Sequence, residues 1–158
     1  MATRIGIYPG AFDPLTFGHL DIIKRSLNIV DKLIIGVADN INKKSLLSID
    51  DRKKLILSDI KTYLETKVDI SIKTVSGLLT DYAKKNNVTC IIRGLRAVSD
   101  FEYEFQMTGM NSRLDSEIET VFLLTSSGKS YISSSIVRDV IRNNGDYTGL
   151  VPETVRVK

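Results

Sequence analysis

The residues of this sequence that are best suited to chemistry lie in the segment Thr16-Phe17-Gly18-His19. Apolar residues recur after it at steps of three and four, which predicts a helix that Thr16 or a neighbour caps. The first turn of a helix has unpaired N–H groups and the positive end of the helix dipole, and both favour an anion. Gly18 lets a ligand approach the backbone closely, and the imidazole of His19 can donate a hydrogen bond to a phosphoryl oxygen. The pattern therefore indicates a phosphate site at the start of this helix.

Arginine side chains suited to anions occur in Arg93-Gly94-Leu95-Arg96, directly after the apolar run 88–92. That run is typical of a buried strand, and ligands of open α/β sheets bind at the carboxyl ends of the strands. Two guanidinium groups at this place, with Gly94 between them, favour a site for anionic oxygens over a pair of surface arginines. We therefore expect the segment to follow the strand and to lie beside the phosphate site.

Two other polar segments allow two interpretations each. Ser133-Ser134-Ser135 precede apolar residues at helical spacing. They are either helix caps, worth about 1 kcal/mol, or a second anion site built from backbone N–H groups and hydroxyls. Lys43 and Lys44 follow another predicted strand, where paired lysines are either solvated surface or supply a mobile charge to a phosphate. The residue types by themselves leave both choices open.

Strands and helices alternate along the chain and position these segments. Apolar runs predict strands at residues 5–8, 33–38, 88–92 and 119–124, and alternating apolar and polar residues predict one at 68–75. Helices are expected from residues 17, 48, 77, 99 and 133. Pro9 and Gly10 are expected to end the first strand because both are turn formers. Short strands that alternate with helices favour parallel pairing through right-handed crossovers. We predict an α/β, Rossmann-like, doubly wound fold with a five-stranded parallel sheet, in a single domain over residues 1–158.

The predicted helix from residue 99 has an aromatic and methionine-rich face with Phe101, Phe105, Met107 and Met110. Such a face more often packs in the core or against another subunit than binds a ligand. Glu104 is therefore the one residue of this helix that has a functional interpretation.

Composition and charge exclude several classes of protein. The 158 residues are 42% hydrophobic and 26% charged, as in globular proteins. No apolar run approaches the roughly 20 residues of a membrane-spanning helix, so no membrane partner is expected. The net charge of +3, from 22 basic and 19 acidic residues, is too balanced to favour nucleic acid as a partner. The start of the chain lacks the pattern of a signal peptide, so we expect a cytoplasmic location, and the single Cys90 is expected to be a buried, inert thiol.

Three segments, in this order along the chain, resemble one family. They are Tyr8-Pro9-Gly10-x-Phe12-Asp13-Pro14 with residues 16–19, Ile92 to Arg96 with residues 100–104, and Tyr131 to Ser135. Together they resemble the bacterial phosphopantetheine adenylyltransferases, which belong to the nucleotidyltransferase superfamily. The resemblance implies transfer of the adenylyl group of ATP to 4′-phosphopantetheine, which gives dephospho-coenzyme A and pyrophosphate. It further implies a homo-hexamer that uses Mg²⁺, with feedback binding of coenzyme A as a further expectation.

The same resemblance implies roles for individual residues. His19 matches the transition-state stabiliser, and Lys43 and Arg93 complete the expected catalytic group. The expected contacts of the acceptor are Ala11, Lys43, Leu79 and Arg93. The expected contacts of ATP are Ala11, Phe12, His19, Gly94, Leu95, Arg96, Glu104, Lys129, Ser130, Tyr131, Ile132, Ser133, Ser134 and Ser135. No residue is expected to be a metal ligand.

One position departs from the family pattern, because the family usually has Ser or Thr where this chain has Ala11. A hydroxyl expected at the acceptor phosphate is therefore missing. Two other functions are open at this point. One is adenylyl or cytidylyl transfer to a different phosphorylated acceptor, such as nicotinamide mononucleotide. The other is a regulatory module that binds a nucleotide without turnover.

Overall fold

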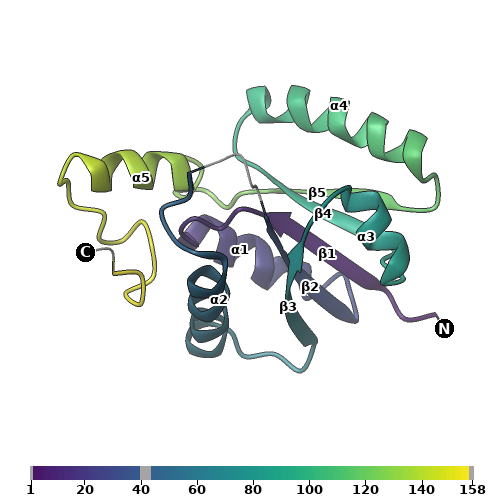
Figure 1. Cartoon of the computed structure of the whole chain (residues 1–158), viewed down its shortest axis with the longest axis horizontal. Helices are drawn as coiled ribbons and strands as arrows, with labels where there is room; N and C mark the ends of the chain where they lie inside the picture. Colours follow the sequence, from purple (N-terminus) through teal and green to yellow (C-terminus); the bar gives the residue numbers. More distant parts are fainter. Residues whose placement is uncertain (1, 40–43, 157–158) are drawn as a thin grey trace.

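The computed structural model describes residues 2–39 and 44–156 (Figure 1). Strands and helices alternate from one end of the described chain to the other. They are β1 (Ile5–Gly10), α1 (Phe17–Ser26), β2 (Lys32–Ala38), α2 (Ile49–Tyr63), β3 (Asp69–Val75), α3 (Leu79–Lys85), β4 (Cys90–Leu95), α4 (Val98–Leu114), β5 (Glu119–Leu124) and α5 (Ser134–Arg142).

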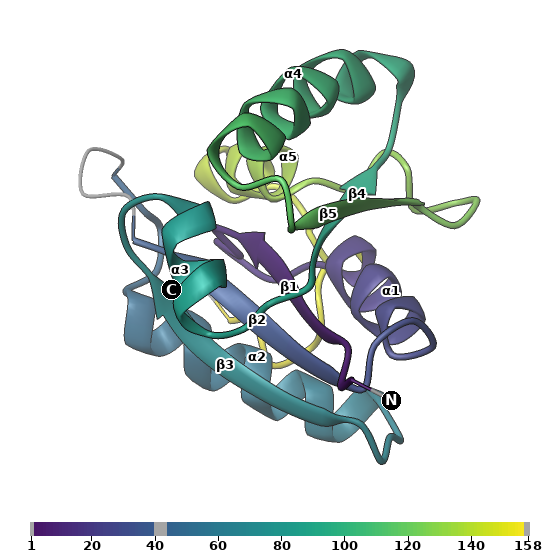
Figure 2. The same ribbon diagram turned by 90° about the vertical axis from the view of Figure 1, so that its right-hand side faces the viewer.

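The strands form one parallel sheet in the order β3-β2-β1-β4-β5. Helices α1 and α2 cover one face, while α3 and α4 lie on the other (Figure 2). The sequence prediction of a Rossmann-like, doubly wound fold with a five-stranded parallel sheet is confirmed. Strand order reverses at the centre of this sheet, because β2 follows β1 on one side and β4 joins β1 on the other. Ligands of open α/β sheets bind at such a point, beyond the carboxyl ends of the strands.

The core is split between the two faces of the sheet. Ile35 and Ile92 point toward α1 and α2, whereas Ile7 and Ile91 point toward α3. Strands β1 and β2 are buried on both faces, which explains why they read as continuous apolar runs in the sequence. Their carboxyl ends are therefore held rigidly by packing on both sides.

Strand β1 is longer than the sequence predicted. Pro9 and Gly10 continue the ladder with β2, opposite Gly36 and Val37. Pro9 has no N–H to donate, but its carbonyl accepts from the Arg93 guanidinium on the side where backbone pairing with β4 has ended. The expectation that Pro9 and Gly10 end the strand is wrong. At Pro9 the side of β1 that faces β4 is no longer paired, so the missing N–H of proline costs no hydrogen bond of the sheet.

Strand β4 also runs further than predicted, through Leu95, so Arg93 and Gly94 lie in the strand and not after it. A Cβ atom at Gly94 would lie 3.1 Å from Cγ1 of Ile22 in α1. Glycine at this position therefore lets β4 approach α1 closely.

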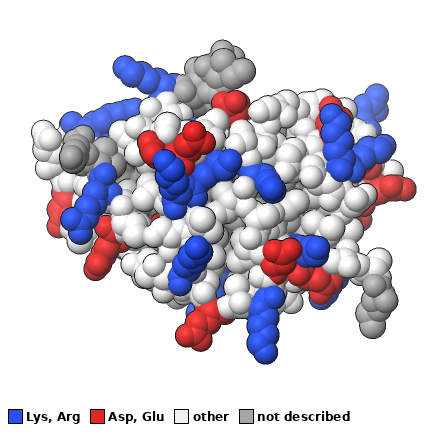
Figure 3. Space-filling model, turned by 60° about the horizontal axis from the view of Figure 1, so that its bottom comes forward, with Lys and Arg blue, Asp and Glu red and all other residues white. Residues whose placement is uncertain are grey.

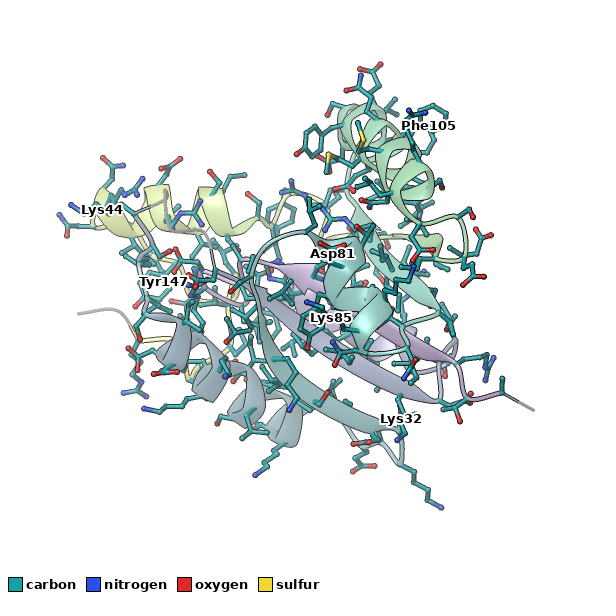
Figure 4. The ribbon with its side chains drawn as sticks, turned by 45° about the vertical axis from the view of Figure 1, so that its right-hand side comes forward. Lys32, Lys44, Asp81, Lys85, Phe105 and Tyr147 are labelled. Carbon is teal, nitrogen blue, oxygen red and sulfur yellow. The ribbon has the colours of Figure 1, made fainter. Side chains whose placement is uncertain are left out.

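Helix α4 leaves most of its apolar side chains in solvent. Phe101, Phe105, Met107 and Met110 are 41–64% exposed. Figure 4 shows Phe105 on the outer side of the helix, away from the sheet. Of the two interpretations of this face, packing in the core of this chain is wrong, because the helix rests on the sheet through few side chains. Its buried residue is Glu104.

Among the described residues, none of the helices combines the length and the hydropathy that crossing a bilayer requires.

Candidate functional site

A pocket of about 360 Å³ opens where β1 and β4 separate. The two strands are paired only at Gly6 with Cys90 and at Ile7 with Ile91, and they diverge toward their carboxyl ends. The pocket is lined by Tyr8, Pro9, Gly10, Ala11, Phe12, Thr16, Gly18, His19, Ile22, Arg93, Gly94, Arg96, Asp100, Glu104, Thr125, Ile132, Ser133, Ser134, Ser135 and Arg138. It therefore brings together the starts of α1 and α5 with the arginines of the β4 segment, as the sequence predicted.

His19 is held at the third position of α1 by a capping box with Thr16. The Thr16 hydroxyl accepts from the His19 N–H at 3.3 Å, and the Thr16 N–H donates to Nδ1 of His19 at 3.0 Å. Because Nδ1 accepts a hydrogen bond, the neutral ring carries its proton on Nε2. The helix cap thus fixes the tautomer of a histidine that lines the pocket.

Aromatic packing fixes the plane of this ring. The Phe12 ring centroid lies 5.0 Å from that of His19 and 5.4 Å from that of Tyr8, in edge-on arrangements. Phe12 is almost fully buried and has a φ of 49°, which is uncommon for a bulky residue. Its side chain therefore serves to orient His19, and only its backbone remains for contact with a ligand.

The environment of His19 disfavours a positive charge. Burial, assisted by the nearby charge of Arg96, lowers the pKa of the imidazole from 6.5 to about 4. The ring is therefore a neutral donor through Nε2 at physiological pH. It can therefore donate a hydrogen bond without carrying a positive charge.

We expect a titration of the lone histidine, followed by NMR, to have its midpoint near pH 4 and not near 6.5. The unfolded chain takes up this proton first, so the stabilisation is fully present above pH 6.5 and is lost as the pH falls through about 4. The free energy of unfolding of wild type should therefore decline more steeply over this range than that of His19→Gln, which has no imidazole. A midpoint near 6.5 would contradict the assignment of a neutral ring at physiological pH.

Arg93 and Glu104 form an ion pair in the wall of the pocket. Nε of Arg93 donates to Oε2 of Glu104 at 2.8 Å, and Nη2 donates to Oε1 at 2.5 Å. The remaining nitrogen, Nη1, donates to the carbonyl of Pro9 at 3.3 Å. Burial alone lowers the pKa of Arg93, but the paired carboxylate raises it, so the guanidinium stays charged. Glu104 lines the predicted site, and its carboxylate is committed to holding Arg93.

The serines at the start of α5 differ in what they contact. Ser133 is the N-cap and accepts from the Ile136 N–H at 3.2 Å. Ser134 donates to the carbonyl of Pro14 at 2.8 Å and so ties the helix to the loop after β1. Ser135 is exposed and lines the pocket. Capping is thus present, and the first turn of α5 also borders the cavity.

Several predicted contacts lie away from the lining of the pocket. Leu95 is in the core, Leu79 packs with the cluster beside α3, and Ser130 and Tyr131 are exposed. Lys43 falls outside the described residues. These assignments stay predictions.

Lys129, another predicted contact of ATP, is held by helix α1. Its Nζ lies 3.7 Å from Oδ1 of Asp21, and the same carboxylate accepts from the N–H and the hydroxyl of Ser126. Burial would raise the pKa of Asp21, but the Ser126 bonds and the charges of Lys129 and Arg25 lower it. A charged Asp21 therefore fixes the loop after β5 against α1, beside the pocket.

Sequence reasoning missed two residues that shape the pocket. Arg138 lines it, and its Nη1 donates to the carbonyl of Asp13 at 2.8 Å. Its position four residues after Ser134 on one helix was a usable signal, because such residues share a face. Asp13 had no predicted contact, yet its carboxylate accepts from the N–H groups of Leu46 and Leu47 at 2.7 and 2.8 Å. Nothing in the sequence indicated that long-range contact.

The comparisons with known proteins agree with this geometry. The sequence model of the cytidylyltransferase-like family matches residues 7–140. A solved structure from Francisella tularensis, a bifunctional NMN adenylyltransferase/ADP ribose pyrophosphatase, is similar with a TM-score of 0.67 and 18% identity. The match covers 99% of this chain and 45% of that one, so this chain spans less than half of its length. At this identity the likeness concerns the fold alone.

Two relatives are much more similar in sequence. The phosphopantetheine adenylyltransferase of Geotalea daltonii is 51% identical over 156 residues, which cover 99% of this chain and 94% of the relative. That of Syntrophotalea carbinolica is 49% identical over 156 residues, covering 99% and 92%. With about half of its residues identical over nearly its whole length, the chain belongs to the phosphopantetheine adenylyltransferase family.

Proposed function

We propose that this chain catalyses the reaction for which its relatives are named, the transfer of the adenylyl group of ATP to 4′-phosphopantetheine. The observation that carries the proposal is the pocket itself, where a neutral histidine donor, Arg93 and Arg96 meet the starts of two helices. Such a set of donors favours polyanionic groups over a single charge. The pocket volume of about 360 Å³ is in the range of small-molecule sites.

The reaction is an in-line displacement at phosphorus. An oxygen of the acceptor phosphate forms a bond to the α-phosphorus of ATP, and the bond from that phosphorus to the bridging oxygen of pyrophosphate breaks. The acceptor phosphate is already ionised, so no side chain has to act as a nucleophile or a general base. Catalysis then consists of positioning and of stabilising charge on the equatorial oxygens.

Each group in the pocket has a part in this scheme. His19 donates from Nε2 to an oxygen of the α-phosphate. Arg93, held by Glu104, binds the acceptor phosphate. The first turn of α5, together with Arg96 and Arg138, binds the β- and γ-phosphates. Lys43 is proposed as a further donor to the α-phosphate.

Magnesium is proposed to arrive with the nucleotide. Within residues 2–39 and 44–156, no group of three His, Cys, Asp or Glu side chains is placed to hold a metal ion. The nearest carboxylates of the pocket are engaged, since Asp100 accepts from the N–H of Arg96 and Glu104 pairs with Arg93. Mg²⁺ commonly binds through substrate phosphates, where it would offset part of their charge.

Ala11 offers a test of the acceptor site by gain of function. Its side chain is exposed and lines the pocket, so Ala11→Ser adds a hydroxyl without disturbing the core. A hydrogen bond to a charged phosphate is worth about 1.5–3 kcal/mol, so we expect kcat/KM for 4′-phosphopantetheine to rise about tenfold. The KM of ATP should stay within about twofold in the same assay. An unchanged kcat/KM would show that the acceptor phosphate does not lie beside Ala11.

The proposed reaction is tested by measuring pyrophosphate release from ATP against a panel of acceptors. We expect 4′-phosphopantetheine to be preferred over nicotinamide mononucleotide by at least about 10²-fold in kcat/KM. A preference for nicotinamide mononucleotide would mean that the proposed acceptor is wrong and that the adenylyl-transfer reaction is right. ATP binding without pyrophosphate release in the presence of any of the acceptors would favour the regulatory module.

Assembly into a homo-hexamer is a further proposal. It is supported by the apolar face of α4, where Phe101, Phe105, Met107 and Met110 are 41–64% exposed. Contiguous exposed apolar side chains on a helix are typical of subunit contacts. Light scattering coupled to size exclusion measures the assembly directly, and a monomer at working concentration would reject it.

We also propose that coenzyme A binds the same pocket, because it shares the pantetheine and adenosine diphosphate groups of the product. Competition of coenzyme A against ATP in the pyrophosphate assay tests this. A cytoplasmic reaction, with neither nucleic acid nor membrane as partner, completes the proposal. On the face shown in Figure 3, Lys and Arg side chains are interspersed with Asp and Glu and do not form one continuous basic stripe.

A further inference from the structure

The guanidinium of Arg52 is buried directly behind the loop that follows β1. Arg52 lies in the first turn of α2 and is 4% exposed. Its Nη1 donates to the carbonyl of Ala11 at 2.7 Å and to that of Ala38 at 3.4 Å, and its Nε donates to the carbonyl of Ser48 at 3.4 Å. These acceptors belong to the ends of β1 and β2 and to the cap of α2. One side chain thus joins three elements around the edge of the site.

Among the residues that the structure describes, this buried charge has no carboxylate partner. None of the Asp and Glu side chains in the described parts of the chain forms an ion pair with Arg52. The residues outside the description, 1, 40–43 and 157–158, include no Asp or Glu. A buried cation without a counter-charge is expensive, and carbonyl dipoles compensate it only in part. The positive charge of Arg52 is therefore compensated, among the described residues, by three carbonyl oxygens and by no negative charge.

A negatively charged ligand in the pocket would supply a compensating charge close to Arg52. Ala11, whose carbonyl accepts from Arg52, also lines the pocket, while Arg52 does not. The guanidinium therefore lies behind the wall of the site, and the peptide of Ala11 separates it from the cavity. A phosphate in the pocket would interact favourably with it through a medium of low dielectric constant.

The hydrogen bond from Arg52 also sets the direction of a backbone amide. The peptide between Ala11 and Phe12 is trans, so its C=O and N–H point in opposite directions. Drawing the Ala11 carbonyl toward Arg52 turns the Phe12 N–H away from it. Among the described residues no partner accepts from that N–H, and Phe12 lines the pocket.

The neighbouring carbonyls are anchored in the same manner. Arg138 donates to the carbonyl of Asp13, and Ser134 donates to that of Pro14. The loop carbonyls at residues 11, 13 and 14 thus accept hydrogen bonds from side chains of α2 and α5. These three carbonyls are therefore directed toward side chains of the two helices.

We propose that Arg52 is a positioning residue for adenylyl transfer, which fixes the Ala11–Phe12 peptide with its amide toward the pocket and supplies a buried charge that bound phosphate neutralises. The inference rests on the proposed function for its substrate. Its electrostatic part concerns the binding of any phosphate chain in the pocket.

Thermal unfolding with and without inorganic triphosphate tests the charge. Arg52→Met keeps the length of the side chain and removes the buried charge. We expect its apparent affinity for triphosphate, derived from the shift in Tm, to fall about tenfold relative to wild type. Lys54→Met is the matched control, since it removes one exposed positive charge from the same helix and should keep the wild-type shift. An Arg52→Met shift equal to that of wild type would overturn the proposal.

Arg52→Lys separates positioning from charge and decides the question if the Met variant does not fold. Lysine keeps the cation but lacks the rigid guanidinium plane, which donates from Nη1 to the carbonyls of Ala11 and Ala38 and from Nε to that of Ser48. We expect kcat to fall about tenfold while the KM of ATP stays within about threefold. An unchanged kcat in this variant would refute the positioning role. The proposed function is judged separately, by pyrophosphate release in wild type, so its failure leaves the triphosphate comparison intact.

Discussion

His19→Ala is expected to lower kcat for pyrophosphate release by roughly 10²–10³-fold, because it removes a preorganised donor to the α-phosphate. The donor is preorganised because the Thr16 N–H occupies Nδ1 and the Phe12 ring packs against the imidazole. The KM values of both substrates should change much less than kcat, since the interaction is made chiefly in the transition state. Steady-state kinetics at saturating ATP measures the effect.

His19→Gln is the matched control for the helix cap. Glutamine is a common third residue of a capping box, so its side chain can accept from the Thr16 N–H as the imidazole does. Stability should then equal that of wild type within about 1 kcal/mol, while turnover stays low because the amide cannot also reach the phosphate. Near-normal turnover in either variant would show that the imidazole is not part of the chemistry.

Arg93→Met is expected to lower kcat/KM for 4′-phosphopantetheine by at least about 10²-fold and to destabilise the chain by about 3 kcal/mol. The side chain of Glu104 is 11% exposed and loses both of its hydrogen bonds in this variant. An uncompensated buried carboxylate is the cause of the lost stability. Urea unfolding and acceptor-dependent kinetics measure the two effects independently.

The double variant Arg93→Met, Glu104→Leu separates folding from function. Replacing both partners of a buried pair by apolar side chains is commonly neutral or stabilising, so most of the lost stability should return. Acceptor binding should stay weak, because the charge that holds the phosphate is still absent. Recovery of kcat/KM together with stability would mean that the pair has only a structural role.

The sequence alone determined the order of strands and helices, the family, and many of the residues that gather at the carboxyl edge of the sheet. These features depend on local chemistry. Apolar runs such as 33–38 must be buried, and Thr16 is a good cap wherever a helix starts. Alternation of the two kinds of element then leaves a parallel sheet as the favoured arrangement.

Local chemistry was misleading where a neighbour supplies what a residue lacks. Pro9 stays in β1 because Arg93, distant in sequence, donates to its carbonyl. Gly94 lies in an extended strand because Ile22 of α1 needs the space. Neither partner can be identified from the residues beside the glycine or the proline.

Only the tertiary structure decided which charges pair and which are left over. It joins Arg93 to Glu104, Lys129 to Asp21 and the carboxylate of Asp13 to the segment before α2, and it buries Arg52 among carbonyls. A charge in a sequence is surrounded by many candidate partners, and the folded chain selects among them by distances of a few ångströms. The sequence therefore predicted a phosphate site at this edge of the sheet, whereas the fold decided how each charged group in and around the pocket is held.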